Sequence, residues 1–349
     1  MEYAQLSNRF IGFALECATT SELYASLARF IASDPELLAI ASCSKAGQPA
    51  PNLFLGAVHY LLLQKPKSSL SSYYASLAGN PKTIDSALYP LFKSFCLDNR
   101  ESIVGLLRTK LVQTNEAGRC AYLYPCFCLI YDTVQKPLAL IEIGTSAGLQ
   151  LLWDQYSYSY SHASRELYGN RQSAVHLQAE VRGSGEPFLK HAPPPVAARI
   201  GIDLHPNRQN DAEHYDWLQA LIWPEHNERR ELFEKAAACV REQSLQLIEA
   251  DAVTCLPIIA ESIPEDAALC IFHTHVANQF TPQAKQQLLD QISELGFKRD
   301  VFHLYNNICD KRLHLDYFIS GEAHHMVMAE TEGHGRWLEW LAKDRLPLR

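Results

Sequence analysis

Residues 138–149, Leu138-Ala-Leu-Ile-Glu-Ile-Gly-Thr-Ser-Ala-Gly-Leu149, are the stretch that decides the fold of this chain. An apolar run with an acidic residue near its end leads into a turn of small residues and then into an amphipathic segment. This order predicts a strand, a tight loop and the start of a helix. Glu142, Gly144, Ser146 and Gly148 form the pattern E-x-G-x-S-x-G. Because glycine allows left-handed backbone angles and a helix N-terminus offers N–H donors, the turn is typical of a loop that holds a nucleotide-like ligand.

The composition is that of an ordinary globular protein, with 47% hydrophobic and 20% charged residues among 349. A chain of this length can form two domains. The net charge of −8 argues against nucleic acid or an anionic membrane as a partner, because both favour a basic surface. The longest apolar run, Leu53 to Leu63, contains His59 and is too short to span a bilayer. Neither a nucleic-acid nor a membrane partner is therefore expected, and the oligomeric state is left open.

The ten cysteines are scattered and include no C-x-x-C pair. The N-terminus shows no charged segment followed by an apolar one, as a secretion signal would. Reduced, buried thiols and a cytoplasmic location are therefore expected.

Residues 1–135 show apolar positions at helical spacing and no convincing strand, which predicts an all-α domain. The segment Asn52–Leu63 is apolar nearly all round and predicts a central buried helix. After Pro137 short apolar runs alternate with helical patterns. This change predicts an α/β domain over residues 136–349, with a Rossmann-like, mostly parallel sheet. The predicted strands are Leu138–Ile143, Ala198–Leu204, Leu245–Glu249, Ala268–Phe272, Asp300–Tyr305 and a final pair, Leu315–Ser320 with His325–Ala329.

The interval between the first two predicted strands, Trp153 to Pro195, is longer than an ordinary crossover loop. Residues 156–160 and 175–181 both alternate with period two, which predicts an inserted β-hairpin within about 155–195. The insertion either covers or shapes a pocket, or is an edge decoration of the sheet.

The turn itself has three interpretations. Gly144, Ser146 and Gly148 line a nucleoside moiety, or Ser146 is the nucleophile of a G-x-S-x-G elbow as in α/β-hydrolases, or the turn is purely structural. A hydrolase elbow normally follows several strands, whereas this one ends the first. Glu142 is also unusual in a hydrolase elbow strand. Both points favour ligand binding.

Acidic residues follow the next two predicted strands. Asp203, near His205, ends the second strand, where a carboxylate can accept hydrogen bonds from ribose hydroxyls. Asp251 with the small residue Ala252 ends the third strand, which suits an adenine amino group. The alternative for each aspartate is to cap the following helix.

His273 and His275 end the fourth predicted strand and would project to the same side if the strand continued. Histidine suits acid–base work near neutral pH. A metal site needs further ligands, which the sequence does not place, so we expect no metal. The other alternative is that the two histidines have a structural role. Three more segments are distinctive: the polar run Gln113–Arg119, which either faces a cleft or caps a helix, and Trp223–His226 and His334–Trp337, which indicate no chemistry.

At Glu142–Gly148, Asp203 and Asp251 the chain resembles class I S-adenosylmethionine-dependent methyltransferases. The resemblance implies that Gly144 and Gly148 line the methionine and ribose part of the cofactor, Asp203 the ribose hydroxyls and Asp251 the adenine. Two features depart from that pattern: Ser146 stands at the usual middle glycine, and the first two strands are far apart in sequence.

Over nearly its full length the chain resembles a bacterial family known as domain of unknown function 2332. The shared motifs are Gln113-Thr-Asn-Glu116 with Gly118-Arg119, Glu142–Leu149, Gly201–Pro206, Trp223-Pro224-Glu225 and His334–Trp337. This second resemblance implies a methyltransferase-like fold and no particular reaction. The combined expectation is a methyltransferase that binds S-adenosylmethionine and acts on a small molecule, with His273 or His275 accepting a proton. The alternatives are a serine hydrolase that uses Ser146 and a binding or regulatory protein without catalysis.

Overall fold

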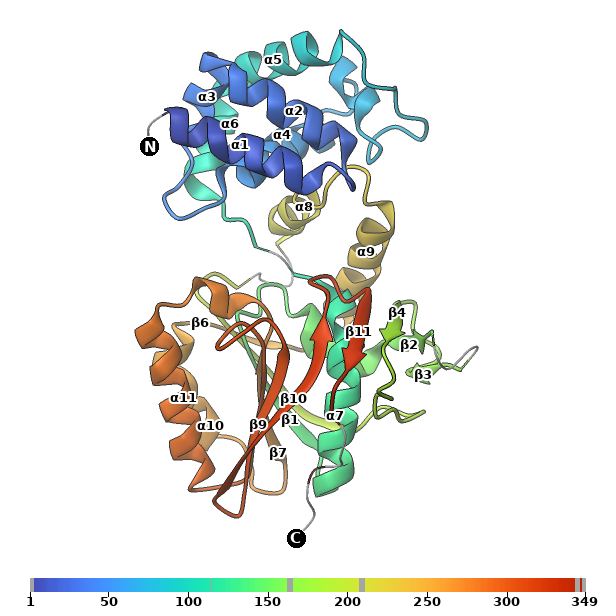
Figure 1. Ribbon diagram of the computed structural model, residues 1–349, viewed down its shortest axis with the longest axis vertical. Helices are drawn as coiled ribbons and strands as arrows, with labels where there is room; N and C mark the ends of the chain where they lie inside the picture. The colour runs from blue at the N-terminus through green and yellow to red at the C-terminus, as the bar shows by residue number, and fades with distance from the viewer. Residues whose placement is uncertain (1–2, 114, 162–165, 207–210, 343–345, 347–349) are drawn as a thin grey trace. The chain divides into compact units, whose positions relative to one another are not determined.

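The computed structural model describes residues 3–113, 115–161, 166–206, 211–342 and 346, and it divides into two compact units (Figure 1). The helical unit comprises Met1–Thr114 and Asp211–Glu231, and the sheet unit comprises Asn115–Asn210 and Leu232–Arg349. The division thus falls at residue 114 and not at the predicted 135, and a later segment returns to the helical unit.

The helical unit consists of helices that pack around one apolar core. Ser21 and Asp34 begin two of the helices by accepting hydrogen bonds from backbone N–H groups of the first turn. Residues 53–62 of α4 are all buried, which confirms the predicted central helix. No helix that the structure describes is long and apolar enough to cross a membrane. The elements are α1 (Tyr3–Cys17), α2 (Glu22–Ser33), α3 (Pro35–Ala41), α4 (Ala50–Gln64), η1 (Ser69–Tyr73), α5 (Leu88–Asp98), α6 (Arg100–Thr109), α8 (Ala212–Ala220) and the start of α9 (Asn227–Glu242).

The sheet unit is a mixed α/β structure built on an 11-stranded sheet with more parallel than antiparallel pairs. The strand order is β3-β2-β4-β11-β10-β9-β8-β7-β1-β5-β6. Every predicted strand is present within a few residues of its expected bounds, and β3 and β11 are additional strands. The strands are β1 (Leu138–Ile143), β2 (Ser157–Tyr160), β3 (Tyr168–Gly169), β4 (His176–Arg182), β5 (Val196–Asp203), β6 (Gln246–Glu249), β7 (Ala268–His273), β8 (Val301–Tyr305), β9 (Leu313–Ile319), β10 (Glu322–Thr331) and β11 (Trp337–Trp340).

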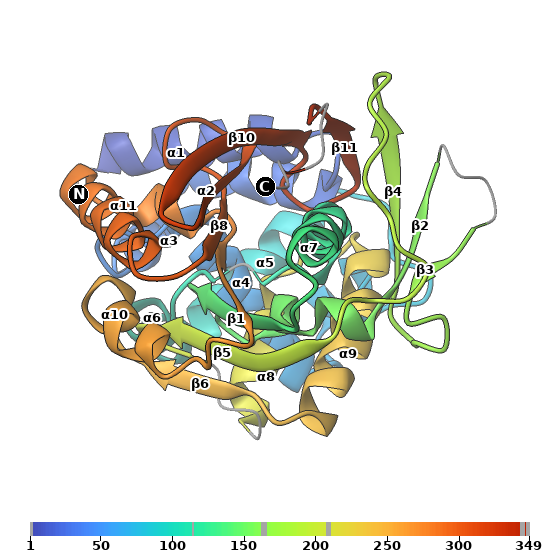
Figure 2. The ribbon, with the colours of Figure 1, turned by 90° about the horizontal axis from the view of Figure 1, so that it is seen from below.

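Helices cover both faces of this sheet. On one face α10 (Ala252–Glu261) and α11 (Pro282–Gly296) pack over the apolar side chains of β1 and β7. On the other face the sheet curls around α7 (Cys120–Val134), as Figure 2 shows. Residues 120–130 of α7 are all buried. Because α7 packs inside the sheet, it belongs to the sheet unit, which explains why the division falls before this helix. Among its described residues the unit also has three short 3-10 helices: η2 (Ala117–Arg119), η3 (Leu149–Gln155) and η4 (Val276–Gln279).

The predicted inserted hairpin is wrong in its pairing. Two strands form where the alternation places them, but β2 and β4 pair in parallel, and only the two-residue β3 pairs antiparallel with β2. On its other edge β4 pairs in parallel with β11. Period-two alternation sets strand character but not the partner, and here the second partner comes from the far end of the sequence. Residues 162–165 of the insertion lie outside the described residues.

Candidate functional site

The turn after β1 has left-handed backbone angles at three positions: φ is +73° at Gly144, +49° at Ser146 and +74° at Gly148. The N–H of Gly148 donates to the carbonyl of Thr145 at 2.8 Å and closes the turn. The predicted strand and tight turn are confirmed. The element that follows is not an α-helix but the seven-residue 3-10 helix η3, which is kinked at Leu152. So short a helix offers no macrodipole of the strength that the sequence suggested.

Side chains of the protein fill the space beside both glycines of the turn. A Cβ on Gly144 would lie 2.5 Å from the Val276 side chain, and one on Gly148 would lie 2.7 Å from the Leu245 side chain. The glycines therefore admit these side chains, which differs from the predicted role of leaving room for a ligand.

Asp203 ends β5, the neighbour of β1, and its carboxylate holds the turn. One carboxylate oxygen accepts a hydrogen bond from the backbone N–H of Ser146 at 2.9 Å, and the other accepts one from the N–H of His205 at 2.8 Å. A carboxylate oxygen has two lone pairs, so each oxygen can still accept one bond from a ligand. Asp203 thus lies at the end of the second predicted strand, as the sequence predicts, and its contact with the turn was not predicted.

Glu142 is buried on β1, with 2% of its surface exposed, and accepts a hydrogen bond from the Thr145 hydroxyl at 2.7 Å. Burial, together with the nearby charge of Asp203, raises the pKa of Glu142 to about 8, against the opposing Thr145 bond. The Glu142 carboxyl group is therefore mostly protonated at neutral pH.

Asp251 begins α10, and its side chain accepts a hydrogen bond from the backbone N–H of Thr254 at 3.3 Å. The capping alternative is thus realised at this position. Ala252 is the first residue of α10 and is partly buried. Both residues follow β6, which pairs with β5, so they lie at the same sheet edge as Asp203.

His273 is the last residue of β7 and is fully buried; its ring centroid lies 5.2 Å from that of His303 and 5.8 Å from that of Tyr305. Burial, and to a smaller extent the charge of Lys285, lowers the pKa of His273 to about 3. Strand β7 ends here, and His275 has a left-handed φ of +63°, so the two histidines do not continue one strand as expected.

His275 is partly buried, and its backbone N–H donates to the side-chain oxygen of Asn306 at 2.7 Å. Burial, followed by the charges of Arg119 and His334, lowers its pKa to about 4, although Glu332 acts in the opposite direction. His275 is therefore neutral near pH 7 and lies among charged groups, whereas His273 lies in the core.

Two motifs that the sequence left without a chemistry pack against each other at this edge. A Cβ on Gly118 would lie 2.3 Å from the carbonyl oxygen of His334, and one on Gly335 would lie 2.1 Å from the carbonyl oxygen of Gly118. From the first motif Arg119 donates through Nε to the Gly333 carbonyl at 2.8 Å. This contact between the two motifs was not predicted from the sequence, and its only signal was one glycine in each motif, Gly118 and Gly335. Thr114 of the first motif lies outside the described residues.

A carboxylate–histidine pair joins His334 of the second motif to Glu332, two residues before it. The Glu332 carboxylate accepts hydrogen bonds from the His334 ring at 2.9 Å and from the Arg336 guanidinium at 3.1 Å. Partial burial tends to raise the Glu332 pKa, but these hydrogen bonds outweigh it and hold the pKa well below its usual range.

Within the part of the chain that the structure describes, several buried polar atoms at this edge make no hydrogen bond. They belong to residues just before η2 and just after the parallel strands β1, β7 and β8. Unpartnered buried polar atoms cost stability, so their collection at one edge favours a ligand that supplies partners there. The atoms are Asn115 Oδ1, Ser146 Oγ, His275 Nε2 and Asn306 Nδ2.

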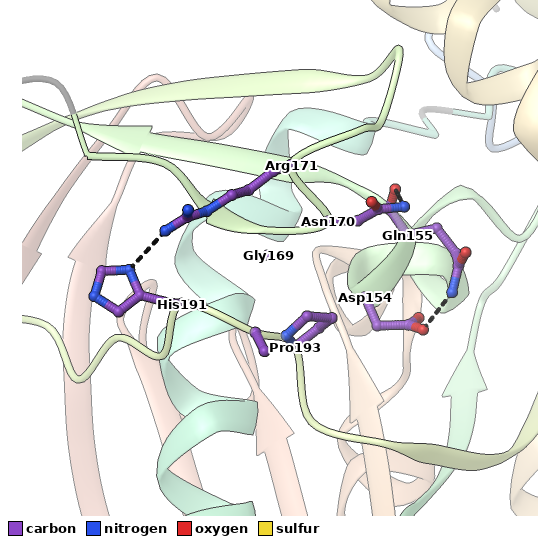
Figure 3. Close-up of a pocket in the computed structure, with 8 residues that line it drawn as sticks. Asp154, Gln155, Gly169, Asn170, Arg171, His191 and Pro193 are labelled. Carbon is purple, nitrogen blue, oxygen red and sulfur yellow. Dashed lines mark hydrogen bonds between the residues drawn. The ribbon is translucent and has the colours of Figure 1, made fainter.

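A hollow of about 500 Å³ lies elsewhere in the sheet unit and is drawn in Figure 3. Residues of the insertion, including Asn170 and His191, form its walls together with Asp154 of η3, and the guanidinium of Arg171 contacts the His191 ring at 3.3 Å. The insertion thus shapes a hollow, but none of the predicted cofactor residues lines it.

The third motif, Trp223-Pro224-Glu225, lies in the helical unit and has a structural role. The Glu225 carboxylate accepts hydrogen bonds from the Ser21 hydroxyl at 2.7 Å and from the Leu23 N–H at 3.0 Å. It therefore braces the first turn of α2.

The sheet unit is thus a mixed α/β unit in which several polar side chains lie at the carboxyl ends of its parallel strands. Residues 7–340 match the model of a family described as an uncharacterized protein conserved in bacteria, domain of unknown function 2332. The chain belongs to this family. Comparison with curated proteins and with solved structures finds no match.

Proposed function

We propose that the chain is a methyltransferase that binds S-adenosylmethionine at the carboxyl edge of its sheet and acts on a small molecule. The observation that carries the proposal is the set of unpartnered polar atoms after β1, β7 and β8. The five strands β6-β5-β1-β7-β8 are all parallel and, numbered along the chain, have the order 3-2-1-4-5. This is the order of Rossmann-like sheets, which bind ligands outside the carboxyl ends of the strands where the order reverses. Here that point is the end of β1.

The residues at this point suit an adenosyl ligand in part. Asp203 keeps acceptor capacity for ribose hydroxyls, and Ser146 presents a hydroxyl group without a partner in the described structure. Asp251 and Ala252 follow β6 and are assigned to the adenine side of the site. Gly144 and Gly148 act by shaping the turn, and Glu142 by closing it through Thr145. When bound, the cofactor supplies a methyl group on a sulfonium centre.

Acid–base work is assigned to His275 and not to His273. The His275 side chain is neutral near pH 7, and its Nε2 makes no hydrogen bond to a described residue. In the tautomer that carries the ring proton on Nδ1, this nitrogen can accept a proton from the methyl acceptor. His273 is closed off by His303 and Tyr305 in the core.

Calorimetry with S-adenosylmethionine and S-adenosylhomocysteine tests the proposal. Binding of both is expected, with at least about tenfold weaker affinity in Asp203→Asn, because one charge-assisted bond is lost. Asp290→Asn, an exposed position on α11, is the matched control. No heat and no thermal shift with either ligand at millimolar concentration would remove the proposal.

The two alternatives give different results in further measurements. A serine hydrolase needs a base hydrogen-bonded to Ser146, and in the described part of the chain its Oγ makes no hydrogen bond. Labelling of Ser146 by a fluorophosphonate probe would establish the serine hydrolase, even though no base forms a hydrogen bond with Ser146 Oγ in the described structure. A binding protein without catalysis would bind the adenosyl ligands but transfer no methyl group to any acceptor.

A further inference from the structure

Arg119 is a buried cation at the carboxyl edge, with 5% of its surface exposed. Its Nε donates to the Gly333 carbonyl at 2.8 Å and its Nη1 to the Thr274 hydroxyl at 3.2 Å. Thr274 in turn donates to the side-chain oxygen of Gln150 at 3.0 Å. These contacts fix the guanidinium just after β7, but they are all to neutral groups.

No carboxylate of the described residues lies within 4.0 Å of the Arg119 guanidinium. Glu142 is mostly protonated at neutral pH because burial raises its pKa to about 8. Glu332 is already engaged with His334 and Arg336.

A buried guanidinium without a counter-ion is unusual, because charged side chains are rarely buried unless they are paired. A guanidinium has five N–H donors in a fork that matches a carboxylate, and only two of them have partners among the described residues. Arg119 also lowers the pKa of the neighbouring His275, which places the histidine in the positive field of the same guanidinium.

The geometry points to Arg119 as the subsite for a carboxylate group of the ligand at this edge. The inference rests on the proposed function only for the source of that carboxylate. The source is either the amino-acid end of the adenosyl ligand or a carboxylate on the methyl acceptor. Arg119 lies by β7 and Asp203 ends β5, so the carboxylate is held on the opposite side of β1 from the ribose.

Thermal unfolding at constant ionic strength tests the subsite without the adenosyl ligand. Replacing chloride by about 0.1 M acetate is expected to raise the wild-type Tm by about 3 °C more than that of Arg119→Met. Arg119→Lys keeps the positive charge but loses the forked guanidinium, so it should retain less than half of the acetate-dependent rise in Tm. This variant replaces Arg119→Met in the test if Arg119→Met does not fold. Arg336→Met, at an exposed arginine paired with Glu332, is the control and should behave as wild type. Equal increments in wild type and the Arg119 variants would overturn the inference.

A second arm identifies the source of the carboxylate. Calorimetry compares S-adenosylhomocysteine with 5′-methylthioadenosine, which lacks the carboxylate. If Arg119→Lys weakens only the former, by about tenfold or more, the cofactor supplies the carboxylate. If neither affinity changes while the acetate increment is lost, the acceptor supplies it. If neither ligand binds wild type, the proposed function fails, and the acetate result still decides the role of Arg119.

Discussion

Glu225 and His59 of the helical unit differ from a set of polar side chains at the carboxyl edge of the sheet unit in how completely the protein satisfies them. The contrast concerns these residues and not the whole helical unit, where Ser71 and Tyr74 also keep a buried atom without a partner in the described structure. In the helical unit both oxygens of Glu225 accept hydrogen bonds from the start of α2. His59 is fully buried there, and its two ring nitrogens contact the Ala220 carbonyl at 2.9 Å and the Ser76 hydroxyl at 2.8 Å. At the sheet edge, by contrast, Ser146, Asn115, His275 and Asn306 each keep a buried atom without a partner in the described structure.

The difference separates two motifs that look equally distinctive in sequence. Trp223-Pro224-Glu225 is explained by the contacts it makes within the chain. The motif around Arg119 is not, because its buried charge has no counter-ion among the described residues. Completeness of internal pairing therefore distinguishes a motif that builds the fold from one that is directed at a ligand.

The largest expected effect concerns the packing of residues 117–119 against 333–335. Gly335→Ala should lower the free energy of unfolding by about 3 kcal/mol or more, because φ is +81° and the new Cβ would meet the Gly118 carbonyl at 2.1 Å. Gly333→Ala is the control, since its Cβ would lie 3.7 Å from the nearest atom, in His275. Urea denaturation measures the free energy of unfolding of both variants. An equal loss of this free energy in the two variants would contradict the close approach of Gly335 to the Gly118 carbonyl.

Replacing a buried histidine tests the comparison itself. His59→Phe should cost about 2 kcal/mol or more, because it leaves the Ala220 carbonyl and the Ser76 hydroxyl without their partner. His303 is as deeply buried, but neither ring nitrogen has a partner among the described residues, so His303→Phe should cost less than about 1 kcal/mol. Chemical denaturation gives both values. The reverse order would contradict the distinction between these two buried histidines.

The pH dependence of stability provides a smaller effect. Burial lowers the pKa of His303 well below its usual 6.5, so the unfolded chain binds the proton first as the pH falls. The contribution of the neutral His303 side chain to the free energy of unfolding is fully present above pH 6.5. Below pH 6.5 this contribution is lost, at about 1.4 kcal/mol per pH unit at most. The raised pKa of Glu142 acts in the opposite sense between about pH 4.5 and 8. For this reason the test is the difference between wild type and His303→Phe, whose unfolding free energy should fall less between pH 7 and pH 5.5. Parallel pH profiles would be evidence against a neutral His303.

The smallest expected effect is at the turn. Ser146 has a left-handed φ of +49° and a buried hydroxyl without a partner in the described structure. Ser146→Gly should therefore leave the free energy of unfolding unchanged or raise it by up to about 1 kcal/mol. Ser146→Val, β-branched at the same angle, should lower it. A destabilising glycine substitution would mean that the hydroxyl group supports the fold.

Much of the fold could be predicted from the sequence because strand character is local. The run Leu138–Ile143 is apolar and all of it is buried in β1. The pairing of β4 with β11 could not be predicted, since it joins segments about 160 residues apart and depends on how the sheet curls around α7. Because the sheet curls around α7, this helix belongs to the sheet unit and not to the predicted helical domain.

The candidate site was predictable where a residue directly follows a strand, as Asp203 does. Its arrangement depends on contacts that no local pattern encodes. Arg119 is held in the site by a hydrogen bond to the carbonyl of Gly333, which lies more than 200 residues later in the chain. His273 and His275 separate because the extended backbone stops between them.

Hydrogen–deuterium exchange of the full chain with and without saturating S-adenosylhomocysteine is the decisive measurement for ligand binding at the carboxyl edge of the sheet. We expect slower exchange in peptides that cover residues 142–149 and 203–206, where the Ser146 and His205 N–H groups donate to Asp203. Unchanged exchange in both peptides, or protection confined to the hollow around Asn170 and His191, would contradict it.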